Sequence, residues 1–252
     1  MADFERFQSA NQLIDRVSVE VGLGANESAY TSNDAALQQL TYMLNTAGQE
    51  LLRMNQWQQL QKIHTFLTDS GPDASPTGVY DLPTDFDHMI DQTQWDQTNR
   101  LPIYGSLSPQ DWEYLEGRQL ANSTIYASFR KREGKMYMFP SPPPDGLTIQ
   151  FEYMSRGWVE STVDTETPYQ DHVQVGSDIV QYDPPLVISF LKLKFFEARG
   201  FDTTKAEGAF NRAFAAACSS DTAAPVLNVS GNLRRYPYLN SWSNLPDTNY
   251  GS

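Results

Sequence analysis

The stretch that decides the fold is DAALQQLTYMLNTAGQELLRMNQWQQLQKIHTFL, residues 34–67. Apolar residues recur in it at every third or fourth position, as at Leu40 and Leu44 and again at Ile63 and Leu67, which places them on one face of an α-helix. No proline interrupts the pattern. The spacing therefore predicts one helix over residues 34–67, roughly 50 Å long, whose apolar stripe needs packing partners from other parts of the chain.

Helices are also expected on both sides of this stretch. Ser32 or Asn33 can cap its start, and Asp34 in the first turn faces the positive end of the helix dipole. An earlier apolar stripe predicts a helix that ends at Gly22. Asp183 and two prolines open a later helix, which Gly200 ends. The expected helices outside residues 34–67 are 7–21, 183–199 and a final one that restarts at Asp202 or Thr203 and runs to Ala217.

Strand patterns fill the middle of the chain. Residues 124–130 and 135–139 flank KREG and predict a hairpin, and residues 147–153 alternate between apolar and polar side chains. Ser108 can cap a short helix. The sequence thus predicts an α+β protein, a helical bundle built from both ends of the chain with an inserted β-rich domain and an extended C-terminal arm. The expected boundaries are 1–77 and 183–221 for the helical core, 78–182 for the β-rich insertion and 222–252 for the arm.

The arm combines prolines with large apolar side chains. Its 31 residues (252 − 221) include Pro225, Pro237 and Pro246. One interpretation is a frayed C-terminus; the other, which we favour, is a segment that orders on a partner, because so many apolar side chains are costly to leave in water. The candidate partner-binding residues are Leu227, Arg234, Arg235, Tyr236, Tyr238, Leu239, Trp242 and Tyr250.

Composition excludes several classes of protein. The chain has 252 residues, 40% of them hydrophobic, and 18 basic against 31 acidic residues give a net charge of −13. Such acidity argues against a protein that holds nucleic acid by charge. The single cysteine, Cys218, excludes an internal disulfide and a cysteine-based zinc site. The N-terminus has no signal-peptide pattern and no apolar run is long enough to cross a bilayer, so we expect no membrane partner.

Motifs for catalysis are missing from the sequence. His64, His88 and His172 stand far apart and in no ligand spacing, and Cys218 follows three alanines near a helix end. We therefore expect no catalytic, cofactor-binding or metal-binding residue and no cofactor, and we expect that the protein is not an enzyme.

An acidic stretch leaves other interpretations open. It lies among Tyr80, Phe86, Trp95 and Trp112. A glycosidase needs two carboxylates beside aromatic rings, and Asp85, Asp87 and Asp91 could bind calcium, although the loop glycine and terminal glutamate of an EF-hand are absent. The third interpretation is a solvated acidic face that caps turns. The acidic residues are Asp81, Asp85, Asp87, Asp91 and Asp96.

Several short stretches, taken in order, resemble a known family. They are GVYDLPTDFD (78–87), TQWD (93–96), RLPIYG (100–105), LSPQDW (107–112), MYMFP (136–140) and IQFEYMS (149–155). With the helix–insertion–helix layout, they resemble the head-to-tail adaptor proteins, or head–tail connectors, of tailed bacteriophages, most closely those of short-tailed phages. The resemblance covers roughly residues 38–208.

The resemblance implies a virion structural protein, made in the host cytoplasm and located at the capsid vertex. It implies a dodecameric ring under the portal ring, with the portal protein, a tail nozzle or other tail protein and further copies of the chain as partners. The helices would form the ring core, the β-rich insertion would face the next tail component, and the arm would reach the portal or a neighbouring subunit. DNA would pass through the channel without specific binding during genome ejection. Alternatives are another ring component of the tail, such as a nozzle or stopper, or a carbohydrate-binding virion protein.

Overall fold

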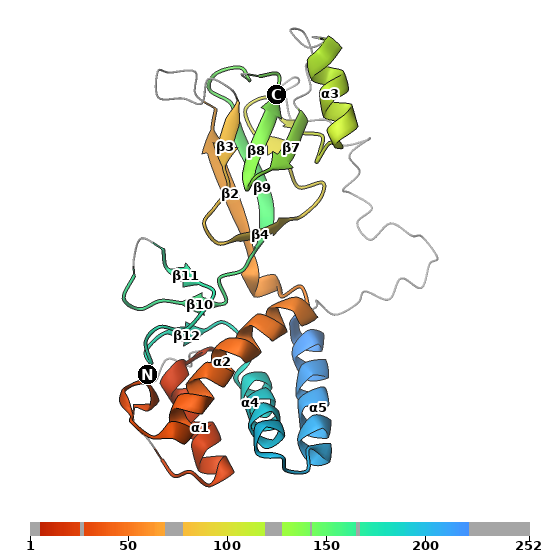
Figure 1. Ribbon diagram of the computed structural model, residues 1–252. Coiled ribbons are helices and arrows are strands. Elements are labelled where there is room, and N and C mark those ends of the chain that lie inside the picture. The colour runs from red at the N-terminus through yellow and green to blue at the C-terminus, as the bar shows by residue number, and fades with distance from the viewer. Residues whose placement is uncertain are drawn as a thin grey trace, which may run out of the picture.

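The computed structural model describes residues 6–25, 28–68, 78–118, 128–141, 143–164 and 167–221. Within these residues it contains five α-helices and three antiparallel sheets, so the predicted mixture of helices and strands is confirmed (Figure 1). The helices are α1 (Ala10–Val21), α2 (Ala35–Met54), α3 (Pro109–Arg118), α4 (Pro184–Arg199) and α5 (Thr204–Asp221). The strands are β1 (Gln8–Ser9), β2 (Gln61–Leu67), β3 (Val79–Asp81), β4 (Phe86–Met89), β5 (Trp95–Asp96), β6 (Leu101–Pro102), β7 (Ser128–Arg132), β8 (Lys135–Phe139), β9 (Thr148–Ser155), β10 (Val159–Glu160), β11 (Tyr169–Gln170) and β12 (Ile179–Val180).

Four of the helices pack together at one end of the molecule, and α4 lies between the others (Figure 1). Its side chains are buried on more than one face, as at Leu186, Val187 and Leu191, because α1, α2 and α5 all contact it. Two ion pairs join α4 to its neighbours: Lys194 contacts Glu50 of α2 at 2.7 Å, and Lys192 contacts Glu20 of α1. The apolar faces of α1, α2, α4 and α5 thus pack together in one core.

Helix ends follow the local signals. The Ser9 hydroxyl accepts a hydrogen bond from the backbone of Gln12, whose side chain bonds back to Ser9. Gly22 ends α1 in the left-handed conformation, at φ 84°, as predicted. The cap of α2 differs from the prediction: Asp34, rather than Ser32 or Asn33, is the N-cap and accepts from the backbone N–H of Ala36 at 2.8 Å.

The prediction of one helix over residues 34–67 was wrong. Helix α2 ends at Met54, Asn55 is extended (φ −152°, ψ 154°), and residues 61–67 form strand β2. Strand β2 pairs along its whole length with β9, from Gln61 opposite Met154 to Leu67 opposite Thr148. This ladder to a segment far along the chain outweighs the local spacing, which fits both periods over these few residues.

Two sheets face each other above the helices (Figure 1). The larger has the order β2-β9-β5-β6, with β4 also on β9, and the smaller has the order β3-β8-β7. Their facing side chains, such as Phe129, Met136, Ile149 and Phe151, form a second core. The predicted hairpin around residues 131–134, the strand near residues 147–153 and the short helix after Ser108 are confirmed as β7–β8, β9 and α3.

A third, small sheet joins the two parts. Its order is β1-β12-β10-β11, so it ties the N-terminal residues to the segment just before α4. The ring of Trp158, which is fully buried, stacks on the ring of Tyr182 between this sheet and α2, with 5.8 Å between the ring centroids. The predicted division of the chain at residues 78 and 183 stays a prediction.

Candidate functional site

A buried polar cluster lies where the large sheet meets the helical part. The ammonium of Lys62 on β2 contacts Asp85 Oδ2 at 2.7 Å. Ser155 donates to the same oxygen at 2.6 Å, and the Tyr153 hydroxyl donates to Asp85 Oδ1 at 2.9 Å. Lys62 also lies over the ring of Tyr169, 3.0 Å from its centroid. The cluster therefore connects β2, the residue just before β4, β9 and β11.

Burial and hydrogen bonding shift the pKa of three groups in this cluster. Burial favours the neutral acid at Asp85, but the hydrogen bonds that Lys62 and Ser155 donate outweigh it and hold the pKa of this carboxyl below its usual range. Burial lowers the pKa of Lys62, an effect that the contact with Asp85 opposes. Burial and then the bond to Asp85 raise the pKa of the Tyr153 hydroxyl. Both oxygens of Asp85 are thus engaged by protein groups.

The remaining acidic residues of the stretch point to separate places. Asp87 contacts His88 at 2.6 Å, and Asp96 is buried and accepts from the backbone of Thr98 and from Asn99. Asp81 forms an exposed ion pair with Lys135. Within the described residues, no three His, Cys, Asp or Glu side chains gather into a metal-binding group. Among the described residues, Asp85, Asp87 and Asp91 therefore do not form the calcium site that the sequence left open.

The aromatic residues around the acidic stretch lie in separate places. Trp112 of α3 packs against Phe139 and Tyr137 at the far end of the sheets, while Trp95 of β5 is exposed on the outer face of the large sheet.

The histidines and the cysteine have structural surroundings. His64 packs between Phe66 and Phe151, and burial lowers its pKa although Asp85 opposes the shift. His172 contacts Asp171 at 2.8 Å on the surface. Burial, and after it the negative charge of Asp221, raise the pKa of the Cys218 thiol.

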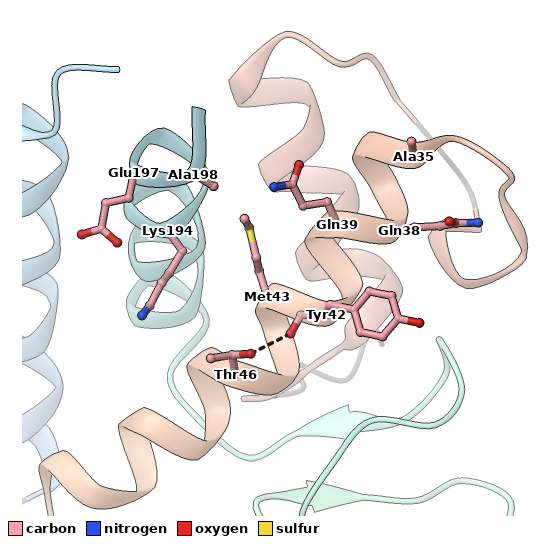
Figure 2. Close-up of a pocket in the computed structure, with 9 residues that line it drawn as sticks. All are labelled: Ala35, Gln38, Gln39, Tyr42, Met43, Thr46, Lys194, Glu197 and Ala198. Carbon is pink, nitrogen blue, oxygen red and sulfur yellow. Dashed lines mark hydrogen bonds between the residues drawn. The ribbon is translucent and has the colours of Figure 1, made fainter. Parts of the chain in front are cut away.

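A groove opens between α2 and α4, and Figure 2 shows its lining. It encloses about 740 Å³, and its wall is mainly apolar, with Met43 directed toward α4. The Tyr42 ring stands beside it, 76% exposed. Lys194 and Glu197 mark its α4 side. A groove of this kind suits an apolar side chain of another protein better than a reacting small molecule.

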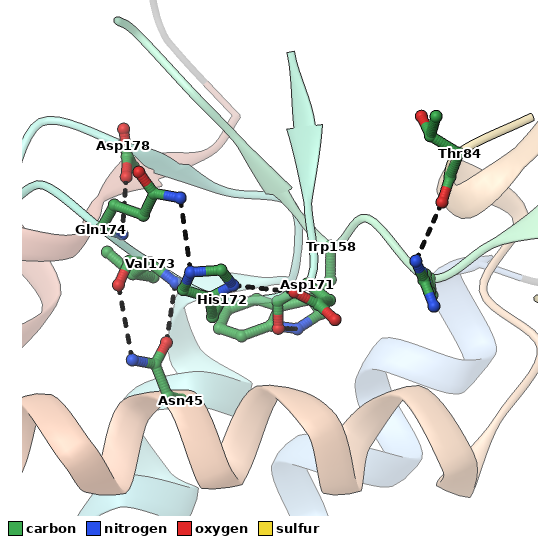
Figure 3. Close-up of polar contacts among 9 residues, drawn as sticks. Asn45, Thr84, Trp158, Asp171, His172, Val173, Gln174 and Asp178 are labelled. Atoms are coloured by element: carbon green, nitrogen blue, oxygen red, sulfur yellow. Dashed lines mark hydrogen bonds and ion pairs between the residues drawn. The ribbon is translucent and has the colours of Figure 1, made fainter. Parts of the chain in front are cut away.

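The loop of residues 171–178 connects the small sheet to α2 through several hydrogen bonds, as Figure 3 shows. Asn45 of α2 brackets Val173, accepting from its N–H at 2.7 Å and donating to its carbonyl at 3.4 Å. The carboxylate of Asp178, fully buried, accepts from the backbone N–H groups of Gln174 and Val175. The Trp158 indole donates to the carbonyl of Asp171 at 2.8 Å.

Next to this loop lies a polar cleft of about 690 Å³ between the C-terminal end of α2 and the sheets. Arg53, His88 and Arg156 line it together with Asp87 and Asp171. The cleft therefore brings acidic and basic side chains together at the boundary between α2 and the sheets.

Sequence reasoning and structure therefore overlap little at the site. The eight predicted partner-binding residues of the arm lie outside the described residues. Lys62 and Tyr153, which complete the Asp85 cluster, carried no local signal, because only the pairing of β2 with β9 brings them together. The α2–α4 groove was equally hidden, since its walls come from opposite ends of the chain.

Comparison with known protein families gives a match over most of the chain. The model of the family described as SU10 adaptor protein matches residues 8–231. No curated protein matches the chain. Among the described helices, none has the length and apolar character needed to cross a membrane.

Proposed function

Because the chain belongs to the SU10 adaptor protein family, we propose that it joins the portal ring to the tail of a bacteriophage virion. The observation that carries this proposal is the extent of the match. Residues 8–231 include the helical part, all three sheets and the Asp85 cluster. The match therefore extends over all of the described helices and strands rather than over one motif.

We propose further that the protein works as a dodecameric ring, with the helical bundle as its core. Exposed apolar side chains support a protein with several protein partners. Tyr42 stands on the helical part, Ile63 lies on the outer face of the large sheet, and Phe201 lies in the turn between α4 and α5. Apolar groups on different faces suit head-to-tail contacts, in which each copy uses two different surfaces.

The net charge of −13 supports a role around moving DNA. A negative channel wall repels phosphates, so DNA slides through it without binding. We propose that part of the excess acid lines the exit channel. Charge reversal of wall residues should then slow genome ejection.

The C-terminal arm, residues 222–252, is proposed to contact the portal protein or a neighbouring subunit through its aromatic and arginine residues. The β-rich insertion is proposed to present the surface on which the next tail protein docks.

Two measurements test this function. The mass of the purified chain in solution, alone and with the portal protein of the same virion, should change from a monomer to a ring bound to portal. Cryo-electron microscopy of the intact particle should place the chain between portal and tail. A position elsewhere in the tail would instead identify a nozzle or stopper and would contradict the proposal.

A further inference from the structure

Strand β2 forms one edge of the large sheet, and its outer side is open. Among the described strands it pairs only with β9 (Figure 1). It is seven residues long, from Gln61 to Leu67. A free edge of this length presents a row of unpaired N–H and C=O groups, which favours the addition of another strand.

The hydrogen bonds of β9 show which residues of β2 face the open side. Ile90 donates its N–H to the carbonyl of Glu152, and Gln97 donates to the carbonyl of Thr148. Even-numbered residues of β9 therefore bond toward β4 and β5, and odd-numbered residues bond toward β2. Through the register of the pair, these odd-numbered residues meet Lys62, His64 and Phe66. The backbone groups of Gln61, Ile63, Thr65 and Leu67 consequently point away from β9.

The same four residues carry an unprotected outer face. Ile63 and Leu67 are 61% and 60% exposed. Sheet edges are usually protected by proline, by a lysine or by a bulge. Strand β2 has no proline, and its one lysine, Lys62, turns inward to Asp85. This edge is therefore exposed in a manner typical of a strand that has a partner.

The described part of the chain ends close to the start of β2. Helix α5 ends at Asp221, whose carboxylate accepts a hydrogen bond from the backbone N–H of Gln58 at 2.9 Å. Gln58 stands three residues before β2 begins. The region matched by the family continues past Asp221 to residue 231.

The sequence that follows has the pattern of a strand. In VLNVSGNL, residues 226–233, one row holds Leu227, Val229, Gly231 and Leu233, and the other holds Val226 followed by the polar Asn228, Ser230 and Asn232. The stretch contains no charged residue and no proline. Its outer row of apolar side chains would continue the exposed row of β2.

We propose that residues 226–233 add a strand to the open edge of β2 in the same chain. The segment leaves α5 at the end of β2 that lies nearest the helices, so the two strands run parallel, with residues 222–225 as the connection. Such a short tether gives the segment an effective concentration in the millimolar range at the edge of β2 in its own chain. A second copy of the chain in dilute solution cannot compete with a segment at that concentration. This inference does not depend on the proposed role in a virion, since it concerns the isolated chain.

Residue-resolved amide hydrogen exchange on three purified chains tests the proposal: the full chain, a chain ending at Leu233 and a chain ending at Asp221. In the first two, the amides of Ile63 and Thr65 should be protected. In the chain ending at Asp221 they should exchange on the order of 100-fold faster. The amide of His64, which bonds to β9, should remain protected in all three and shows that the sheet is folded.

The remaining outcomes overturn the proposal. Equal exchange at Ile63 in all three chains would leave the edge without this partner. Protection that depends on protein concentration, or that arises only after the portal protein is added, would assign the edge to a second copy or to another protein.

Two substitutions in the full chain form a matched pair. Val229→Asp places a charge in the apolar row and should expose the amides of Ile63 and Thr65 to the same degree as truncation at Asp221. Asn228→Asp places the same charge one residue earlier, on the other face, and should preserve most of the protection. Similar exchange in the two variants would contradict the predicted strand.

Discussion

Lys62 and Asp85 form an ion pair of 2.7 Å at the junction of the large sheet and the helical part, and their side chains are only 19% and 12% exposed. Tyr153 and Ser155 complete the hydrogen bonding of the carboxylate. A charge that is removed from water is stable only when a counter-charge and hydrogen bonds replace its hydration. If one partner of such an ion pair is removed, the remaining charge has no compensation. The pair therefore holds the residue just before β4 against strands β2 and β9.

Lys62→Met should lower the free energy of unfolding by about 3 kcal/mol, because it leaves the Asp85 carboxylate buried without its counter-charge. Urea unfolding monitored by tryptophan fluorescence measures the change. Lys135→Met is the matched control, since it removes the exposed ion pair with Asp81 and should have no measurable effect. Equal losses in the two variants would show that Lys62 contributes only as a surface residue.

Acid should weaken the protein through Asp85. The pKa of this carboxyl is lower in the folded chain than in the unfolded chain, so its contribution is present above the unfolded value of about 3.9 and is lost as the pH falls below it. Asp85→Asn should reduce the slope of unfolding free energy against pH below about pH 4.5. Asp87→Asn, at the half-exposed neighbour, serves as control and should retain the slope of the unmodified chain. An unchanged slope in Asp85→Asn would assign the acid sensitivity to other groups.

Gly48→Ala should destabilise the protein by about 2 kcal/mol, because the added methyl group would overlap the indole of Trp158. The indole cannot move easily, since its N–H donates to Asp171 and its ring stacks on Tyr182. Thermal and denaturant unfolding measure the loss. Gly208→Ala in α5 is the control: its methyl group meets only ordinary contacts, and a gain of up to about 1 kcal/mol is expected from helix propensity.

Replacement of Tyr236, Tyr238 and Trp242 by serine should abolish binding to the portal protein, while the free energy of unfolding stays unchanged. The physical reason is that buried aromatic side chains supply most of the energy at protein interfaces. Sedimentation of the variant with and without portal protein measures the effect. Replacement of Ser241 and Asn244 by alanine in the same segment is the control and should bind normally. Normal binding by the aromatic variant would remove these three residues from the interface.

The helices were predictable wherever local signals were sufficient. The stripe of α1 ends at Gly22 and that of α4 at Gly200, and both glycines adopt the left-handed conformation that such positions require. The spacing of Ile63 and Leu67 did not distinguish a helix from a strand, because a spacing of four residues satisfies the helical period and the strand period alike. Their exposure shows that the apolar side chains of β2 never formed the buried helix face that the spacing indicated.

The candidate site was less predictable than the fold. In the sequence, Asp85 is one of several acidic residues near aromatic residues, and nothing distinguishes it from the others. Its contacts depend on Lys62 and Tyr153, which lie 23 residues before it and 68 after it. No local pattern encodes a contact over such separations. The same applies to the groove between α2 and α4, whose walls meet only after the chain has returned from the sheets.

The chain leaves the helical part at β2 and returns to it after β9, and the register places Gln61 directly opposite Met154. Both ends of this long excursion are therefore neighbours in space. A segment with adjacent ends can be replaced by another of different size without altering the path of the helices that carry it. The two facing sheets are accordingly encoded by one continuous stretch of coding sequence, which recombination can exchange while the helical part is retained.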